Sequence, residues 1–233
     1  MNCDAALNSF SQGPRLANNA YSTDEQSWVK LPDDSILDFD GGLHSQRYIP
    51  SLNKWIPDAD LPVQLYNSAS EIGPGLLLPD GKAFFLGGTG TNVIYTPSGN
   101  TNMGTWAQAA DIPSPYCGWD NPAAMMFNGK ILCVFGCGIL PDGLYEYDPV
   151  ADTFTSVGTW DRSGVTHTLL DLPDGTVLLS DGSSASLHLY TPDGTPLASG
   201  KPTISSITQN GDGLYHLTGT LLNGISQGAS FRR

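Results

Sequence analysis

The sequence has few positive charges and lacks the long apolar runs of membrane-spanning proteins. Only 10 lysines and arginines stand against 23 aspartates and glutamates, giving a net charge of −13 and a pI near 4.3. A chain this acidic repels phosphate groups, so we expect no nucleic-acid partner. The longest apolar stretch, residues 131–140, is about half the length of a bilayer-spanning helix, so we expect no membrane insertion either.

Cysteine and histidine are also sparse, with four residues of each. No Cys-x-x-Cys pair occurs and no histidine lies near Cys133 and Cys137, so the sequence predicts no zinc site. We expect the cysteines to be buried free thiols, and the alternative is one disulfide between Cys117 and Cys137. Serine hydrolase chemistry is not indicated, because no Gly-x-Ser-x-Gly sequence is present.

Residues that interrupt helices are abundant. The chain has 27 glycines and 17 prolines, which leave little room for long helices and favour short strands joined by turns. The apolar content of 39% is nevertheless sufficient for a buried core. We therefore expect a folded chain made mostly of short strands.

The chain contains an internal repeat with four copies. Each copy has an apolar run, a turn resembling Pro-Asp-Gly, and a second apolar run, with the turn residues Asp34, Gly81, Gly129 and Gly175 spaced 47, 48 and 46 residues apart. A Tyr-x-Pro sequence follows each turn, beginning at Tyr48, Tyr95, Tyr147 and Tyr190. Two registers that stay in step over four copies indicate a structural repeat.

Each copy predicts a small antiparallel sheet of four strands. Asp-Gly and Asn-Gly pairs suit hairpin turns that need positive φ, and the apolar runs on both sides are typical of strands covered on both faces. One such sheet cannot bury its own faces, whereas sheets stacked around an axis can, so the predicted fold is an all-β propeller. We expect Leu76–Leu78, Ala124–Met126 and Leu169–Leu170 in the innermost strands.

The repeat resembles the kelch family of propellers. Residues 27–32, 71–82 and 126–132 are similar to bacterial kelch-repeat proteins related to galactose oxidase and glyoxal oxidase. The resemblance covers about residues 25–200. It implies a kelch-type β-propeller, and an extracellular or cell-envelope location for the parent protein, although this chain shows no signal peptide.

The resemblance also suggests how the chain is divided. Residues 25–66, 67–116, 117–164 and 165–200 are expected to be four kelch blades of an incomplete ring. Residues 1–24 are expected to be the outer part of a preceding blade, and residues 201–233 the beginning of an immunoglobulin-like β-sandwich. We therefore expect a fragment of a longer protein, and a complete small propeller is the alternative.

His167 is the candidate metal ligand. In copper-radical oxidases of this superfamily, a Tyr-His pair just before an inner strand binds copper. The matching stretch here has His167 but carries Thr166 at the tyrosine position, and a threonine hydroxyl cannot form a phenoxyl radical. We expect His167 to be a structural, hydrogen-bonded residue and expect no cofactor; copper ligation by His167 is the alternative.

Loops that join one blade to the next open on a single face of a propeller and are candidates for binding. Two of them carry aromatic and charged residues suited to sugars or peptides: Tyr116, Trp119 and Asp120, and Trp160, Asp161 and Arg162. The competing interpretation is that these aromatics pack between blades.

Two functions therefore stay open. The leading prediction is a non-catalytic module that binds a glycan or a protein through these loops. The alternative is a fragment of a copper-radical oxidase of the galactose or glyoxal oxidase type, with copper ligands largely outside this chain or lost from it.

Overall fold

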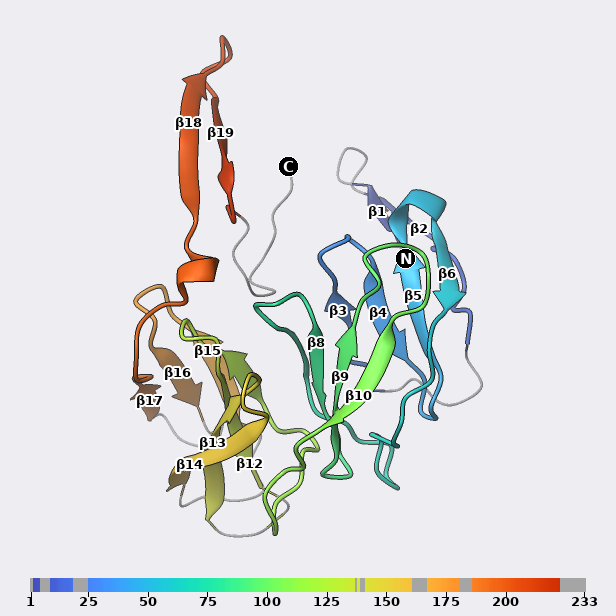
Figure 1. The fold of residues 1–233 in the computed structure, drawn as a ribbon, viewed down its shortest axis with the longest axis vertical. Coiled ribbons are helices and arrows are strands. Elements are labelled where there is room, and N and C mark those ends of the chain that lie inside the picture. Colours follow the sequence, from blue (N-terminus) through green and yellow to red (C-terminus); the bar gives the residue numbers. More distant parts are fainter. Residues whose placement is uncertain are drawn as a thin grey trace.

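A computed structural model describes residues 2–4, 9–18, 25–136, 138, 141–160, 167–180 and 186–222. In this part of the chain the structure is all-β, with two single-turn 3-10 helices, Pro50–Leu52 and Ala198–Gly200. Four antiparallel sheets are arranged as the blades of a β-propeller (Figure 1), which confirms the predicted fold class. Among the described residues no helix is long and apolar enough to span a bilayer.

The four sheets follow one another along the chain as blades one to four. Blade one consists of β3 (Val29–Lys30), β4 (Ile36–Phe39), β5 (Ser45–Ile49) and β6 (Lys54–Pro57). Blade two consists of β7 (Gly75–Leu77), β8 (Ala83–Leu86), β9 (Asn92–Thr96) and β10 (Thr105–Ala109). Blade three consists of β11 (Ala123–Met125), β12 (Ile131–Phe135), β13 (Asp142–Asp148) and β14 (Thr153–Trp160).

Blade four has three strands in the described part of the chain, where we expected four. They are β15 (Thr168–Asp171), β16 (Val177–Ser180) and β17 (Leu187–Tyr190). After β17 the chain turns back to blade three, where the Leu197 N–H donates to the Phe127 carbonyl at 3.0 Å. The Asn128 side-chain amide donates to the Asp193 carbonyl at 2.9 Å, so this segment is fixed to blade three instead of adding a strand.

The repeated turn closes in the same way in every blade. The backbone N–H of Leu31, Leu78, Met126 or Leu172 donates to the carbonyl four residues later at 2.8 Å. The fourth of the five residues in each turn has a positive φ. This angle is 66° at Asp34, 85° at Gly81, 85° at Gly129 and 87° at Gly175. Glycine adopts this conformation without a Cβ clash, which explains the repeated Asp-Gly and Asn-Gly pairs.

Apolar side chains join each blade to the next. One cluster packs Leu37 and Phe39 of blade one against Phe85 and other residues of blade two. A second joins blades two and three, and there Phe84 stacks on Tyr147 with ring centroids 4.3 Å apart. A third cluster packs blade three against blade four. Consecutive blades thus bury the faces that a single sheet would leave exposed.

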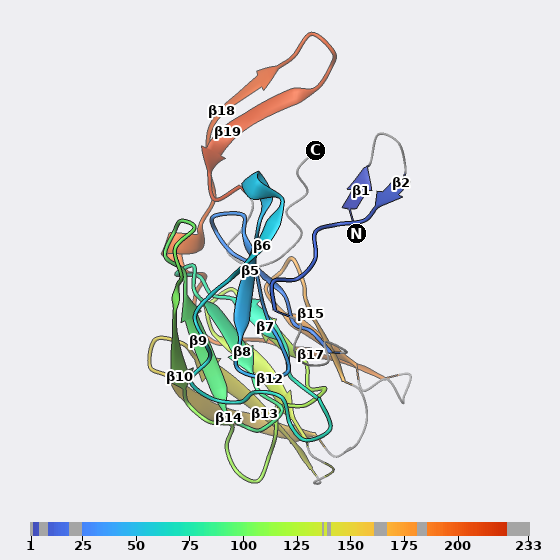
Figure 2. The ribbon, with the colours of Figure 1, turned by 90° about the vertical axis from the view of Figure 1, so that its right-hand side faces the viewer.

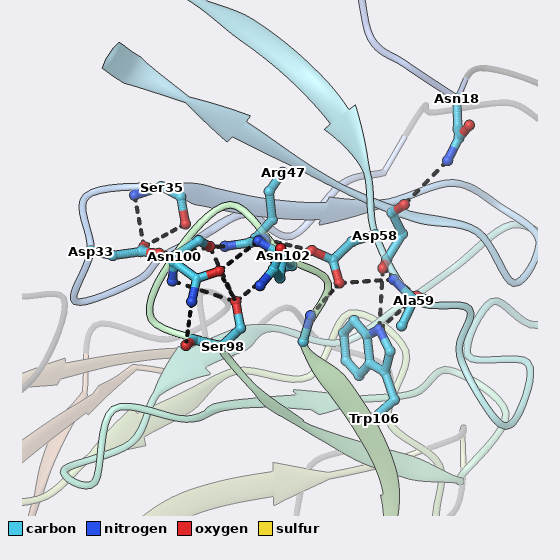
Figure 3. A network of polar contacts seen from close by, with 12 residues as sticks. Asn18, Asp33, Ser35, Arg47, Asp58, Ala59, Ser98, Asn100, Asn102 and Trp106 are labelled. Carbon is cyan, nitrogen blue, oxygen red and sulfur yellow. Dashed lines mark hydrogen bonds and ion pairs between the residues drawn. The ribbon is translucent and has the colours of Figure 1, made fainter. Parts of the chain in front are cut away.

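A buried polar network reinforces the contact between blades one and two (Figure 3). The fully buried guanidinium of Arg47 on β5 pairs with the Asp58 carboxylate, which is also fully buried. The same guanidinium donates to the carbonyls of Asn100 and Asn102 in the β9–β10 loop of blade two. The Gly104 N–H donates to Asp58 at 2.9 Å, so both charges have partners from the neighbouring blade.

Two small sheets lie outside the propeller. β1 (Asn2–Asp4) pairs with β2 (Ser9–Ser11), and β18 (Thr203–Gln209) pairs with β19 (Tyr215–Thr220). The hairpin of β18 and β19 projects away from the blades, and all its residues are exposed (Figures 1 and 2). The β18–β19 hairpin falls within residues 201–233, where we expected the beginning of an immunoglobulin-like β-sandwich, and that domain stays a prediction.

Cys117 corrects our expectation of free thiols, because it is disulfide-bonded. Cys137, the partner that we considered in the alternative, lies outside the described residues. Cys133 in the middle of β12 is free and fully buried, as we expected.

Candidate functional site

One end of the propeller contains the loops that link consecutive blades. Because strand direction alternates in each blade, these links lie at the same end as the turn between the second and third strands. We call this end the link face; its described loops are residues 25–28, 40–44, 58–74, 87–91 and 110–122. Three of the predicted site residues, Tyr116, Trp119 and Asp120, lie on the 110–122 loop of this face.

Tyr116 and Trp119 lie on this loop in different surroundings. Tyr116 is partly buried between blades two and three, where its ring meets Tyr145 edge-on at 5.9 Å and its hydroxyl donates to the Pro141 carbonyl at 3.1 Å. Trp119 is 36% exposed. Tyr116 therefore packs between blades, whereas Trp119 is partly exposed at the surface.

The backbone around Trp119 is well fixed. The Asn121 side-chain amide donates to the Cys117 carbonyl at 2.6 Å, and Cys117 itself is held in a disulfide. Asp120 adopts a positive φ of 55°, and its N–H reaches the Ile72 carbonyl of the preceding link at 3.4 Å. The turn therefore presents Trp119 and Asp120 from a constrained backbone.

Trp160, from the second predicted loop, lies in the interface between blades three and four. Its ring meets His167 at 5.8 Å and His188 at 4.5 Å, both edge-on. Asp161 and Arg162 lie outside the described residues, so their positions stay predictions. The contacts of Trp160 match the interpretation that it packs between blades.

His167 is also buried between blades three and four. Its Nε2 lies 2.7 Å from Asp142 Oδ2, with 5% and 2% of the two side chains exposed. Asp142 is the first residue of β13 and His167 directly precedes β15, so this pair connects the two blades. The structure thus gives the ring the hydrogen-bonding partner expected of a structural histidine; Thr166 lies outside the described residues.

Asp120 meets two acidic residues that our sequence analysis did not select. Carboxylate oxygens of Glu25, Glu71 and Asp120 all lie within 4.8 Å of one another. Glu25 precedes blade one, Glu71 lies between blades one and two, and Asp120 lies between blades two and three. Glu25 and Asp120 occupy the same repeat position, four residues before the equivalent Val29 and Ala124. This shared position is the sequence feature that could have identified Glu25 as a neighbour of the predicted site.

The three carboxylates give the link face a strongly negative point. Desolvation, followed by the charges of Asp120 and Glu25, raises the pKa of Glu71. Glu71 Oε2 is buried and has no hydrogen-bond partner. Such oxygen donors suit hard cations such as Ca²⁺, whereas copper sites generally use nitrogen and sulfur ligands. Among the described residues, Glu25, Glu71 and Asp120 form the one group in which at least three potential metal ligands lie close together. This group contains no histidine.

Two other acidic turns, at Asp40 and Asp212, are closed by hydrogen bonds to one oxygen of each carboxylate. Asp40 Oδ1 accepts the N–H groups of Gly42 and His44 at 2.8 and 3.2 Å, and Asp212 Oδ1 accepts the Leu214 N–H at 3.0 Å. Short polar side chains commonly stabilise turns in this way.

Comparison with known proteins supports the fold. No family model matches the sequence, and no curated protein matches it. A solved fungal alcohol oxidase of the AA5 family, in complex with copper, is similar with a TM-score of 0.55 and 16% identity over 79% of this chain and 44% of that chain. The extracellular domain of a putative hybrid two-component system from B. thetaiotaomicron is similar with a TM-score of 0.50 and 13% identity, over 91% of this chain and 28% of that chain.

These similarities concern the fold alone. The chain spans less than half the length of either structure. One of the two is an oxidase and the other is part of a putative two-component system, so the shared architecture does not decide between catalysis and binding.

Proposed function

We propose that this chain is a non-catalytic propeller module that binds a glycan or a protein ligand through its link face. The observation that carries the proposal is the constrained turn on which the exposed Trp119 ring stands beside the exposed Asp120 carboxylate. A tryptophan ring can stack on a sugar or on an apolar side chain, and a carboxylate accepts hydrogen bonds from hydroxyl or amino groups. A turn that is already ordered loses little entropy on binding.

The charge at the link face narrows the ligand class. Glu25 and Glu71 lie beside Asp120, so an anionic sugar or an acidic peptide would be repelled. We therefore propose a neutral glycan or a basic peptide segment as ligand.

The same proposal includes a kelch-type relationship, a place in a longer parent protein, and an extracellular or envelope location for that protein. The repeat is supported by four equivalent tyrosines, each of which pairs with the second strand of its blade: Tyr48, Tyr95, Tyr147 and Tyr190.

Glycan and peptide arrays test the proposal directly. We expect the chain to bind a neutral glycan or a basic peptide, and expect Trp119→Ala and Asp120→Ala each to weaken that binding about tenfold or more. Tyr215→Ala is the matched control, because it removes an exposed aromatic residue on the distant hairpin. Unchanged binding by Trp119→Ala, or the absence of any array signal, would overturn the proposal.

The oxidase alternative predicts a different result. Its support is the similarity to the AA5 alcohol oxidase and the position of His167, but the Nε2 of His167 is directed to Asp142 within a blade interface. We therefore expect the copper-treated chain to oxidise neither alcohols nor aldehydes and to show no phenoxyl-radical absorption. Peroxide formation above that of a His167→Ala control would support the oxidase instead.

A further inference from the structure

The end of the propeller opposite the link face contains the repeated turns, and we call it the turn face. These turns span residues 31–35, 78–82, 126–130 and 172–176. In two junctions the second residue of a turn covers the turn glycine of the next blade. A Cβ added to Gly81 would lie 3.1 Å from Pro32 Cγ, and a Cβ added to Gly175 would lie 2.7 Å from Phe127 Cδ1.

The junction between blades two and three departs from this pattern. A Cβ added to Gly129 would lie 2.5 Å from Cδ1 of Leu197, which belongs to the segment after blade four. Leu197 is fixed there because its N–H donates to the Phe127 carbonyl at 3.0 Å. Pro79, the second turn residue of blade two, lines a cavity beside Leu197 and Gly129. Leu197 therefore occupies the place that the second turn residue takes in the other two junctions.

The cavity beside Leu197 has the size of a small-molecule site. Its volume is about 460 Å³, and sites for small ligands generally measure about 300–1,000 Å³. Its apolar wall consists of Leu78, Pro79, Pro149, Val150 and Leu197. Leu78 is 3% exposed and Val150 is 96% exposed, so this wall runs from the core to the surface. A compact apolar group can therefore enter from solvent and bury its surface there.

Negative charge predominates around this cavity. Lys130 lines it, and its Nζ is paired with Glu146 Oε2 at 2.9 Å. The hydrogen bond to Glu146, and then the charges of Glu146, Asp148 and Asp193, raise the pKa of the Lys130 ammonium group. Three carboxylates thus act on one ammonium group, and the sum of these charges is negative.

Two carboxylates lie at the cavity itself. Asp80 is compensated by Lys82, whose Nζ lies 2.6 Å from Asp80 Oδ2. Asp148 Oδ1 accepts the N–H groups of Val150 and Ala151 at 2.9 and 3.1 Å, and among the described residues its Oδ2 accepts no hydrogen bond. Asp148 is therefore the charged acceptor that a ligand can use.

We propose that this cavity is a second binding site, separate from the link face, for an organic ammonium ion with a compact apolar body. The apolar body lies against Leu197 and the two prolines, and the ammonium group donates to Asp148. The net charge of −13 attracts the same class of ligand. A ligand of the same shape that carries a carboxylate is repelled.

Three ligands of similar shape and different charge test this proposal: phenethylamine, 2-phenylethanol and 3-phenylpropionate. We expect phenethylamine to shift the methyl NMR signals of Leu78, Val150 and Leu197 in the full chain. At low salt it should bind about two- to fivefold more tightly than 2-phenylethanol, the gain from one exposed ion pair. We expect 3-phenylpropionate to bind more weakly than either, and high salt to reduce these differences.

Two variants separate the charge from the apolar wall. Asp148→Asn keeps an oxygen acceptor for the turn and should remove the preference for phenethylamine over 2-phenylethanol. Its control is Asp212→Asn, because Asp212 also accepts a backbone N–H, in the distant hairpin. Leu197→Ser should weaken the binding of both ligands about threefold or more, since it removes part of the wall. Its control is Leu187→Ser, at a leucine that is 61% exposed on blade four.

Three results would overturn the proposal. The first is that phenethylamine shifts none of the three methyl signals, and the second is that 3-phenylpropionate binds as tightly as phenethylamine. The third is that Asp148→Asn keeps the preference for phenethylamine, or that Leu197→Ser binds both ligands as its control does, with each variant shown to be folded by circular dichroism.

Discussion

Blades one and three share their turns and strand order but differ in the chemistry of equivalent buried positions. The second strand has Asp38 in blade one and Cys133 in blade three, and both residues are fully buried. The third strand has Arg47 in blade one and Glu146 in blade three. The repeat thus constrains the backbone and the burial of a position, but leaves open whether the side chain is apolar or charged.

The difference lies in how many partners each choice requires. The Arg47 guanidinium needs Asp58 and two carbonyls of blade two to compensate its loss of water (Figure 3). Cys133 is packed among apolar side chains and its thiol donates one long hydrogen bond, 3.9 Å, to the Ile131 carbonyl. Burial raises the pKa of this thiol far above the ordinary value, which makes it unreactive. Blade one should therefore be the more sensitive of the two to single polar substitutions.

The largest expected effect is that of Arg47→Met. The substitution leaves Asp58 charged and fully buried without its ionic partner, which should lower the free energy of unfolding by about 3–5 kcal/mol. Replacing both residues, as in Arg47→Met with Asp58→Leu, should recover much of the loss. Urea denaturation of the two single variants and the double variant measures the coupling.

Lys82→Ala is the control for this cycle. The Lys82–Asp80 pair lies at the surface, so its loss should change stability by less than about 1 kcal/mol. A loss for Arg47→Met as small as that of Lys82→Ala would contradict the proposed role of the buried pair.

The second effect concerns the pH dependence due to Asp38. Desolvation, partly offset by the hydrogen bond from Gln46, raises the pKa of Asp38 from 3.8 to about 6. Since the folded state then holds the proton more tightly than the unfolded state, stability is greatest below pH 4 for this group and falls as pH rises through 6. The difference over this window should be about 3 kcal/mol.

Asp38→Asn tests this pH effect. The variant should be more stable than the original chain at pH 7.5 and should lack this part of the pH dependence, which thermal or urea unfolding at pH 4, 5, 6 and 7.5 would show. Parallel pH profiles of the two proteins would indicate that Asp38 titrates normally.

Substitutions of Cys133 test the equivalent buried position in blade three. Cys133→Ser places a hydroxyl among apolar neighbours and should cost about 1–3 kcal/mol, whereas Cys133→Ala should cost less because it adds no polar group. The order of the two variants in urea denaturation is the measurement. If serine were tolerated better than alanine, a hydrogen bond to the Ile131 carbonyl would outweigh the cost of burying the hydroxyl.

A small effect, above that of the surface control Lys82→Ala, is expected for Trp106→Phe. Trp106 Nε1 donates to Ser45 Oγ at 3.1 Å and to the Ala59 carbonyl at 3.0 Å, and phenylalanine keeps the aromatic contact with Phe39 without these bonds. We expect a loss of about 1 kcal/mol. A loss as large as that of Arg47→Met would mean that ring size, not hydrogen bonding, dominates at this position.

Local features of the fold could be predicted from the sequence. The turn residues with positive φ and the apolar runs around them identified the hairpins, and the expected innermost segment Ala124–Met126 overlaps β11, Ala123–Met125. Blade four was less predictable. Its sequence continues the repeat, but contacts of Leu197 and Asp193 with blade three divert the chain after β17.

The candidate site depended more on contacts between distant residues. Trp119 and Asp120 were selected because they stand together in one loop. Glu71 and Glu25 were missed because they join Asp120 only when three links meet at one end of the propeller. The buried role of Arg47 was missed for the same reason, since its carbonyl partners come from the next blade.

The path of the chain after blade four has a mechanical consequence. Leu197 is hydrogen-bonded to Phe127, and the β18–β19 hairpin continues from this attachment. A pulling force on the hairpin is therefore transmitted first to the β11–β12 turn of blade three, and reaches blade four only if this attachment breaks. In an optical-trap experiment, blade three would bear the load while blade four remained shielded behind it.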